Sequence, residues 1–548
     1  MNIIGFDFGT TNSTISYFDP KNNELENFKV SGNNNYIPTV ISYKQKDSSI
    51  SIGKIAKLNI TNKAFEVCEH FKLRLGADAG QIMEGKTKTP FEAARDFIKE
   101  LLREYKNRQR IDKIDKIVMT VPVAWHPKKL HNIAVCKKIE EIYRQLGYGD
   151  VLQLVAEPVA AASYFCWAHE RNKKINPTGA KYNGALMVVD YGGGTLDVTL
   201  CSIENGEKVK VLECWEDDEK GYQANGNAGV AFDEAVIIRL IEKNNLNIEK
   251  GSNTFIKLRD KFEEIKILGK GNITKTLKLY FDNPEIVKDE SLFSLECGND
   301  DYIDVYCEDL MVCFEKINKP VLERALRKME PSFKYYNIDT SNQDNFRVLL
   351  VGGFSNFAAV EEEVRSFFGA SSIYADKRFE HQFSENEVTE VDSLLTISRG
   401  AAVIAEGYIN PIKICNKSIG FIVFSKDESD IWVGKDIKVI EKGTSADEAA
   451  APCFHPSSYR VNSKSGTVRI FVDDESPNKK GRKEFSLDVI FPNIDIPDNA
   501  YYIGFSVDED LIPTIHIKDK YGNTEQTYSK KLIERIKIQE ETDGERYA

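Results

Sequence analysis

One pattern occurs twice in this chain and limits the folds that it can adopt. A short apolar run, then Asp-x-Gly and hydroxyl residues, occupies residues 3–11 and returns at residues 186–197. The aspartates Asp7 and Asp190 lie 183 residues apart (190 − 7), and a further apolar strand follows each turn. A duplicated strand–turn–strand unit predicts two similar α/β lobes that face each other across a cleft.

The wider pattern divides the chain into two structural classes. Residues 1–405 alternate short apolar strands with amphipathic helices, which is typical of α/β architecture. The sequence Thr89-Pro90-Phe91-Glu92 predicts one helix start, because it combines a capping box with proline at the first helical position. From about Pro411, period-2 alternation predicts an all-β sandwich, as in residues 418–425, 466–472 and 502–507.

These patterns predict the domain boundaries. Residues 1–405 form the α/β domain, with lobes at about 1–180 and 181–405, and residues 406–412 form a linker. The β-sandwich occupies residues 413–525, and residues 526–548 form a short helical stub and a charged tail.

Composition excludes several classes of function. The 548 residues carry a formal net charge of −12, which argues against general nucleic-acid or anionic-membrane binding because both require a basic face. The ten cysteines form no Cys-x-x-Cys pair, and the seven histidines show no metal-ligand spacing. The chain opens directly on a predicted strand, without a signal peptide or a membrane span, so we expect a cytoplasmic protein.

The two repeated turns have the chemistry of phosphate-binding loops. Glycine allows backbone N–H groups to converge on an anion, and Gly9-Thr10-Thr11 and Gly192-Gly193-Gly194-Thr195 supply such turns with hydroxyl donors. Carboxylates beside phosphates hold Mg²⁺, largely through its retained waters, and Asp7, Asp190 and Asp197 are placed for this role. A third glycine pair, Gly352-Gly353, follows a buried strand at the end where α/β sheets bind ligands.

With these motifs together, the chain resembles the heat-shock protein 70 (DnaK-type) chaperone family, within the actin and sugar-kinase superfamily. The similarity covers roughly residues 1–525, and it implies a duplicated actin-like (ribonuclease H-like) ATPase domain followed by a β-sandwich. Residues 5–13 are similar to the family's first phosphate loop, residues 190–197 to its second, and Gly352-Gly353 to its adenosine turn. Residues 71–76 match the segment that carries the catalytic lysine, and residues 156–162 match its Glu-Pro-x-Ala-Ala-Ala segment.

The resemblance implies in-line attack of water on the γ-phosphate of MgATP, with slow turnover to ADP and K⁺ as an additional candidate ion. It implies Lys72, Asp7, Glu157, Asp197 and Thr195 as the catalytic residues, and Asp7, Asp190 and Asp197 as the magnesium carboxylates. The implied nucleotide contacts are Gly9, Thr10, Thr11, Asn12, Gly192, Gly193, Gly194, Thr195, Glu263, Lys266, Gly352 and Gly353.

In this family the β-sandwich binds extended apolar polypeptide, so the implied partner is an unfolded polypeptide or one specific protein client. Several departures concern the coupling of the two domains. Leu130 replaces an arginine that, paired with the proline at Pro122, relays nucleotide state, and Gln153 and Ala156 fall where the J-domain cochaperone is contacted. Residues 406–411 replace the leucine-rich linker, and the helical lid is missing apart from a stub near Leu532.

Two positions of the adenine site depart as well, because Ile267 and Asn356 stand where the family has arginines. We therefore predict a divergent, lidless member that retains the ATP site, and leave open whether a J-domain cochaperone or a nucleotide exchange factor acts on it. The alternative is a nucleotide-dependent scaffold that holds one protein partner with slow or no turnover. A filament protein or small-molecule kinase of the superfamily is disfavoured by the β-domain.

Overall fold

The computed structural model describes the chain in segments. They are residues 1–30, 35–75, 79–121, 130–171, 176–216, 228–268, 270–298, 301–369, 392–412, 415, 417–426, 429, 431–460, 465–473, 482–491, 500–507, 513–521 and 525–528. The chain divides into two compact units: residues 1–209 with 213–411, and residues 412–548 with 210–212. Each unit is described by itself.

The first unit contains a sheet built around the first repeat. Its strand order is β3-β2-β1-β8-β9, and β4 also pairs with β2. The strand β1 runs antiparallel to β2 across the Asp7 turn but parallel to β8, which in turn runs parallel to β9. The bounds are β1 Ile3–Phe8, β2 Asn12–Phe18, β3 Leu25–Asn27, β4 Ile37–Pro38, β8 Lys116–Val121 and β9 Leu152–Ala156.

A second sheet of the same unit repeats this arrangement with order β12-β11-β10-β15. The strand β10 pairs antiparallel with β11 and parallel with β15, as β1 does with β2 and β8. The bounds are β10 Gly184–Tyr191, β11 Leu196–Glu204, β12 Lys208–Glu216 and β15 Phe346–Val351. The predicted duplication is therefore confirmed at the level of strand topology.

Helices cover these sheets, and the predicted start of one is confirmed. The helix α2, Pro90–Gln109, begins at a Thr89–Glu92 capping box and packs its apolar face under the first sheet. The other helices of the unit are α1 Gly53–Leu58, α3 Leu130–Gln145, α4 Glu157–Arg171, α5 Gly229–Lys243, α6 Asn253–Leu268, α7 Lys270–Asp282, α8 Cys307–Ile317, α9 Lys319–Tyr335, α10 Ala358–Phe367 and α11 Asp392–Ala405. Two smaller sheets complete the unit: β5 Val40–Lys44 with β6 Ile50–Ile52 and β7 Phe65–Glu69, and β13 Ser291–Gly298 with β14 Asp301–Tyr306.

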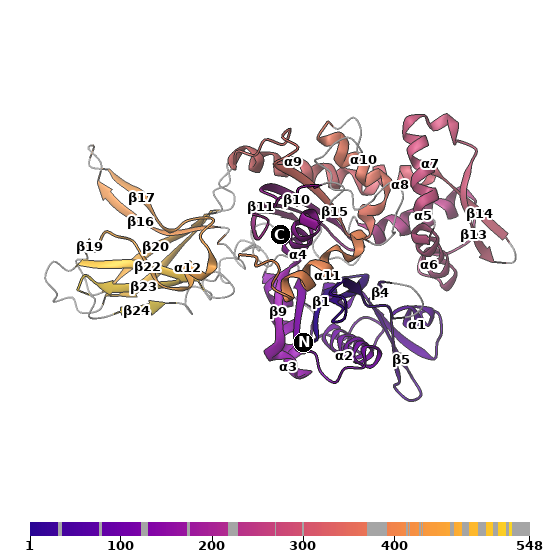
Figure 1. Cartoon of the computed structure of the whole chain (residues 1–548), viewed down its shortest axis with the longest axis horizontal. Coiled ribbons are helices and arrows are strands. Elements are labelled where there is room, and N and C mark those ends of the chain that lie inside the picture. Colours follow the sequence, from indigo (N-terminus) through magenta and orange to yellow (C-terminus); the bar gives the residue numbers. More distant parts are fainter. Residues whose placement is uncertain are drawn as a thin grey trace. The chain divides into compact units, whose positions relative to one another are not determined.

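The helix α11 corrects the predicted lobe boundary. Although it follows the second lobe in sequence, it packs against β1, β2 and β8 of the first sheet (Figure 1). The hydroxyls of Ser16 and Ser398 hydrogen-bond at 2.8 Å, and Gly5 leaves room for the α11 backbone. Residues 392–405 therefore belong with the first lobe in space, because the small residues of β1 and β2 accept this helix.

Where α11 crosses α4, the two backbones touch. A methyl group at Gly400 would overlap the carbonyl oxygen of Ala160, so the crossing has room for glycine alone. The helix α4 also packs against β10 and β11, and α11 also contacts β15. The crossing therefore joins the two sheets of the unit.

Residues 406–411 continue from α11 and remain anchored to the first unit. Ile409 is 3% exposed. The ring of Tyr408 lies 5.1 Å from that of Phe18 and beneath the Arg171 guanidinium, and its hydroxyl accepts a hydrogen bond from Asn23 at 3.0 Å. This segment, predicted to be a linker, is held by an aromatic cluster.

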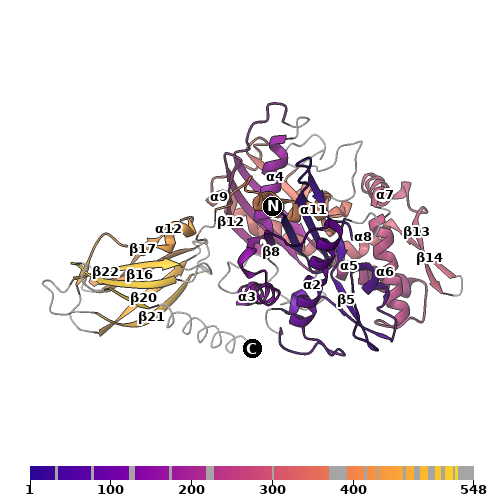
Figure 2. The same ribbon diagram turned by 60° about the horizontal axis from the view of Figure 1, so that its bottom comes forward.

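The second unit is a sandwich of two antiparallel sheets around its own apolar core (Figure 2). One sheet has order β17-β16-β20-β21 and the other β18-β22-β23-β24, with β19 paired to β22. The bounds are β16 Ser418–Lys426, β17 Trp432–Ile440, β18 Cys453–Phe454, β19 Tyr459–Arg460, β20 Ser465–Asp473, β21 Lys483–Ile490, β22 Ala500–Val507, β23 Pro513–Asp519 and β24 Glu525–Tyr528, with α12 at Ala446–Ala450. The three segments chosen for period-2 alternation are all strands.

The predicted end of the sandwich at residue 525 falls inside a strand. Residues 525–528 form β24 and pair with β23, so residues 526–528 are not part of a helical stub. The remainder of the predicted stub and tail, residues 529–548, lies outside the segments that the structure describes.

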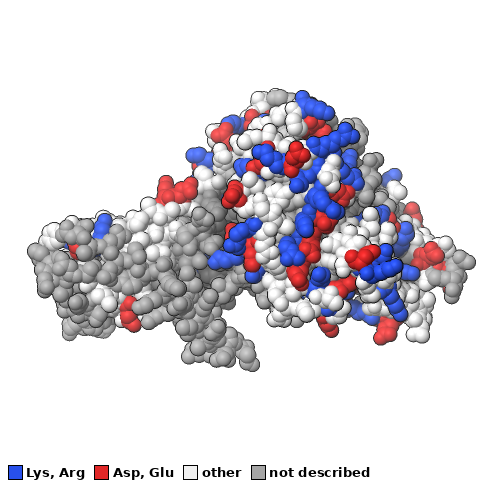
Figure 3. Space-filling view, turned by 90° about the horizontal axis from the view of Figure 1, so that it is seen from below, with Lys and Arg blue, Asp and Glu red and all other residues white. Residues whose placement is uncertain are grey.

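Charge is mixed over the visible surface. Figure 3 shows lysine and arginine interspersed with aspartate and glutamate over the face that it presents. In the segments that the structure describes, no helix has the length and apolar character to cross a membrane.

Candidate active site

Asp7 stands in a row of three residues across the first sheet. Register places Thr14 of β2 and Thr120 of β8 directly opposite Asp7 of β1. The Thr120 hydroxyl donates a hydrogen bond of 2.9 Å to Asp7 Oδ1, and both side chains are buried. The Thr14 hydroxyl is equally buried and has no hydrogen-bond partner in the part of the chain that the structure describes.

Lys72, which is buried, forms an ion pair beside this row with the partly buried Glu157. Lys72 lies on the 3₁₀ turn η1, Phe71–Arg74, and its Nζ is 2.9 Å from Oε1 of Glu157. Glu157 is the first residue of α4 and directly follows β9, which places its carboxylate at the helix N-terminus. The strands of the first lobe thus bring together two predicted site residues that are 85 positions apart.

Burial and neighbouring charge shift the pKa values of these groups. Burial raises the pKa of Asp7 to about 7, and the Glu157 carboxylate adds to this, while Lys72 and the Thr120 hydroxyl oppose it. Burial alone lowers the pKa of Lys72, but the carboxylates of Glu157 and Asp7 outweigh burial, so the net pKa is raised. Lys72 is therefore a fixed cation among carboxylates.

The second lobe presents a pair of carboxylates at the equivalent place. Register sets Asp197 of β11 directly opposite Asp190 of β10, with Val351 of β15 on the other side. Burial, followed by the charges of Glu157, Asp197 and Asp7, raises the pKa of Asp190 well above its usual range. This surplus of negative charge favours a bound cation.

The two predicted phosphate loops meet. A methyl group at Gly193 would overlap the Thr11 side chain, and one at Gly194 would lie 3.0 Å from that of Thr10. The second loop is a tight turn in which the Gly192 amide donates to the Thr195 carbonyl at 3.0 Å. Thr195 itself is exposed at the tip of this turn.

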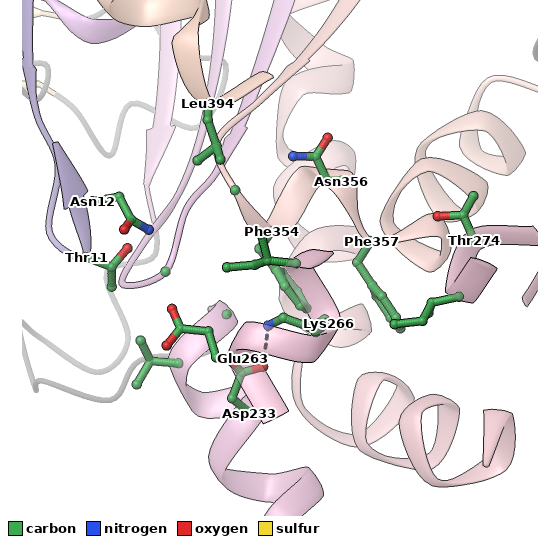
Figure 4. A pocket seen from close by; sticks show the side chains of 16 residues that line it. Thr11, Asn12, Asp233, Glu263, Lys266, Thr274, Phe354, Asn356, Phe357 and Leu394 are labelled. Atoms are coloured by element: carbon green, nitrogen blue, oxygen red, sulfur yellow. Dashed lines mark hydrogen bonds and ion pairs between the residues drawn. The ribbon is translucent and has the colours of Figure 1, made fainter. Parts of the chain in front are cut away.

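An open cavity begins at these loops, and the space in and over it, including open solvent, is about 820 Å³. Figure 4 shows Thr11 and Asn12 at one side, with Glu263 and Lys266 of α6 and the aromatic residues after β15 across from them. Its lining also includes Ile267, Ile273, Thr274, Phe357 and Leu394. Glycine loops with hydroxyl groups, together with apolar and aromatic side chains in one cavity, suit a nucleotide.

Glu263 and Lys266 line this cavity, and each is also part of an ion pair. Glu263 pairs with Lys57 of α1, which joins the two lobes across the cleft. Lys266 pairs with Asp233 of α5 and lies over the rings of Phe232, Phe262 and Phe354. Burial raises the pKa of Asp233 to about 6, although Lys266 opposes this shift.

The third glycine pair, Gly352-Gly353, directly follows β15. Gly352 follows β15 with φ of +85°, and a side chain there would collide with Asp190 Oδ1 and the Tyr191 backbone. Gly353 lines the cavity. Gly352 is therefore required for both its conformation and its close approach to Asp190.

A second, smaller cavity of about 460 Å³ opens beyond Thr10 and Thr11. It is lined by Lys57, His70 and Arg259, among others, and shares Glu263 with the first cavity. His70, with φ of +54°, directly precedes the turn that carries Lys72. The Lys57–Glu263 pair thus stands between the two cavities.

Sequence patterns missed Thr120, Thr14, Lys57 and Asp233. Thr120 had a signal, since it is the polar residue near the end of an otherwise apolar strand. Lys57 and Asp233 had none, because their roles depend on partners far away in the chain. Of the departures, Gln153 is exposed on β9, and Pro122 and the Leu130 side chain lie outside what the structure describes.

Comparisons with known proteins identify the family of this chain. The family model for the Hsp70 protein matches residues 3–375, so the chain belongs to the Hsp70 family. It is also similar to two proteins named chaperone protein DnaK. The protein from Mycoplasmopsis pulmonis is 25% identical over 554 positions, which cover 98% of this chain and 80% of that protein. The protein from Mycoplasma mobile is 25% identical over 415 positions, which cover 75% of this chain and 59% of that protein.

The predicted family and fold class are therefore confirmed. The family model ends before the sandwich, whereas the alignment with the Mycoplasmopsis pulmonis protein covers nearly all of this chain. Membership in this family supports a chaperone function.

Proposed function

We propose that this protein is a MgATP-binding and ATP-hydrolysing chaperone that binds polypeptide through its β-sandwich without a helical lid. The observation that carries the proposal is the Lys72–Glu157 ion pair beside Asp7, in the same unit as a cavity that is lined by residues of both glycine loops. The similarity of this chain to two proteins named chaperone protein DnaK also supports the proposal.

In the proposed reaction, Thr10, Thr11 and Thr195 with the loop amides hold the phosphates of ATP. Lys72 stabilises the charge that develops on the γ-phosphate and orients the attacking water, while Glu157 holds Lys72 in place. Asp7, Asp190 and Asp197 would hold Mg²⁺ through water, and this ion would neutralise phosphate charge. The excess of carboxylates over cations at this site fits this role, as does the Thr14 hydroxyl, which has no partner among the described residues.

For the polypeptide, we propose the end of the sandwich formed by β16 and β17. Phe424, Ile431 and Val433 are exposed there by 43%, 62% and 47%. In this sheet β17 is an edge strand, so an extended segment could pair with its backbone while apolar side chains meet this surface.

This site is tested by binding of a fluorescent apolar peptide to the full chain. Val433→Asp should weaken binding about tenfold or more, whereas Ile490→Asp is the control, because Ile490 is as exposed (54%) but lies on the opposite edge strand, β21. Equal affinities of the two variants would reject this surface.

One observation favours the alternative of a slow, nucleotide-dependent scaffold for a single partner. The segment at 406–411 is anchored by Tyr408 and Ile409 in the first unit, which restricts its freedom to signal between units. Binding of one folded partner without affinity for apolar peptides would support this alternative.

The decisive test of the enzymatic proposal is ATP turnover by the wild type, Lys72→Ala and Asp197→Ala. Each substitution should lower kcat by about 10²–10³-fold, because it removes a charge placed for the transition state. Lys99→Ala is the matched control, since Lys99 is an exposed lysine of α2. Equal turnover in all four proteins would reject the site, and ATP binding without turnover in any of them would favour the scaffold.

A further inference from the structure

The proposed mechanism requires Asp7 to hold one orientation. The last torsion of an aspartate side chain has a broad, shallow preference, so a carboxylate needs a partner to fix its plane. Asp7 is 9% exposed, and the Lys72 ammonium forms its ion pair with Glu157 and not with Asp7.

Thr120 is that partner. It lies directly opposite Asp7 in the parallel β1–β8 register, is 0% exposed, and donates its hydroxyl hydrogen to Asp7 Oδ1 over 2.9 Å. In the segments that the structure describes, no other side chain hydrogen-bonds to this carboxylate. Both residues lie on β-strands, so the backbone fixes the distance between them.

Thr14, on the other side of Asp7, shows what the site is built to receive. Its hydroxyl is buried and lacks a protein partner among the described residues, and buried polar atoms of native proteins are normally satisfied. An unpartnered hydroxyl beside a fixed carboxylate marks a place for a water or ligand oxygen. The second lobe has no counterpart to Thr120, because the residue opposite Asp190 on β15 is Val351.

We propose that Thr120 is a positioning residue that fixes the Asp7 carboxylate for the hydrated magnesium ion of a bound nucleotide. The inference rests on the proposed nucleotide site and adds a residue that acts through Asp7. Thr120 does not need to touch the nucleotide. Loss of the Thr120 hydroxyl should reduce the gain in nucleotide affinity that Mg²⁺ provides. It should change nucleotide affinity in the absence of Mg²⁺ much less.

The test is calorimetric titration of the full chain with ADP, with Mg²⁺ and with EDTA. Mg²⁺ should tighten ADP binding by the wild type. In Thr120→Val, which keeps the shape but loses the hydroxyl, this increment should fall at least tenfold, while affinity in EDTA changes less than threefold. Thr120→Ser, which restores the hydroxyl, should recover most of the increment.

Thr199→Val is the matched control. Thr199 is a buried β11 threonine whose hydroxyl bonds to Cys214 Sγ at 3.4 Å, so its loss removes a strand hydroxyl away from Asp7. This variant should keep the full increment. In turnover assays with Mg²⁺, Thr120→Val should raise KM for ATP and lower kcat, because the gain in affinity that depends on Mg²⁺ is lost.

Three results would overturn the inference: an unchanged increment in Thr120→Val, an equal loss in Thr120→Ser, or an equal loss in Thr199→Val. Failure of the proposed function is distinguishable, because the wild type would then bind no ADP in either condition. A wild type that binds ADP equally with Mg²⁺ and EDTA would leave the nucleotide site standing but reject the role of Thr120.

Discussion

The two halves of the duplicated unit use the same strands for different chemistry. In the first, the central aspartate, Asp7, stands between two hydroxyls; in the second, Asp190 stands between a second carboxylate, Asp197, and an apolar side chain. The first lobe also supplies a cation, Lys72, whose charge offsets part of the negative charge of Asp7 and Glu157. Duplication thus preserved backbone topology while the residues at equivalent positions diverged.

Negative charge is therefore distributed unevenly between the two lobes of this site. The Thr120 hydroxyl and the Lys72 cation reduce the rise in the pKa of Asp7. For Asp190, three neighbouring carboxylates add to the rise in pKa, and Lys72 opposes it. The second lobe therefore has the greater need of a bound cation. Each prediction below tests one part of this asymmetry.

The largest effect should come from neutralising the two central aspartates. Because the pKa of Asp7 rises from 3.8 to about 7 in the folded protein, the fold favours the protonated form, and this contribution is lost as pH rises through about 7. Asp7→Asn should therefore match the wild type near pH 4 and exceed its stability at pH 8 by up to about 4 kcal/mol. Asp190→Asn should continue to gain at higher pH.

These stabilities are measured by thermal unfolding in EDTA without nucleotide, so that no cation offsets the carboxylates. Asp96→Asn on α2 is a control outside the cleft, although it loses contacts with Arg95 and Tyr43. A gain for Asp7→Asn that is independent of pH would contradict the assigned shift.

The next effect concerns the glycine loops. In the first, a methyl group at Gly9 would overlap the backbone of Asn12; in the second, one at Gly193 would meet the Thr11 side chain, which can rotate. Gly9→Ala should therefore weaken ATP binding about 10–100-fold and Gly193→Ala about 3–10-fold, equivalent to about 1–3 kcal/mol and about 1 kcal/mol. Gly80→Ala is the control, because its site is open.

The smallest effect should come from the ion pair that joins the lobes. Lys57 and Glu263 are partly exposed, with about a quarter of each side chain accessible, so solvent screens their attraction. Lys57→Ala should speed ADP release about 2–5-fold in a stopped-flow displacement assay, equivalent to less than about 1 kcal/mol. Lys113→Ala, which removes an exposed pair with Asp115, should leave the rate unchanged.

How much the sequence predicted depended on whether a signal was local. The hairpins, the Thr89 helix start and the sandwich strands were predictable because turn chemistry, capping and alternation act over a few residues. The position of α11 was not, because its pairing with β1 and β2 depends on small residues that are almost 400 positions away. The assigned roles of the site residues stay predictions, although Lys72 and Glu157 do lie together.

The missed residues have the same explanation. Thr120 gains meaning only from its register with Asp7, and Asp233 only from its pairing with Lys266. Neither the register of two strands nor an ion pair between distant residues can be inferred from the sequence around one residue. The duplication made the strand topology of both lobes predictable. It did not make the site residues predictable, because Val351 stands opposite Asp190 where Thr120 stands opposite Asp7.

The contact between Gly400 and Ala160 has a mechanical consequence. Because the two backbones touch, α4 and α11 have no layer of side chains between them that could shear when the cleft changes width. Sliding along either helix would force a neighbouring residue, with its Cβ, into the contact. At this crossing the two helices are therefore interlocked, and a bulkier residue at position 400 would force them apart.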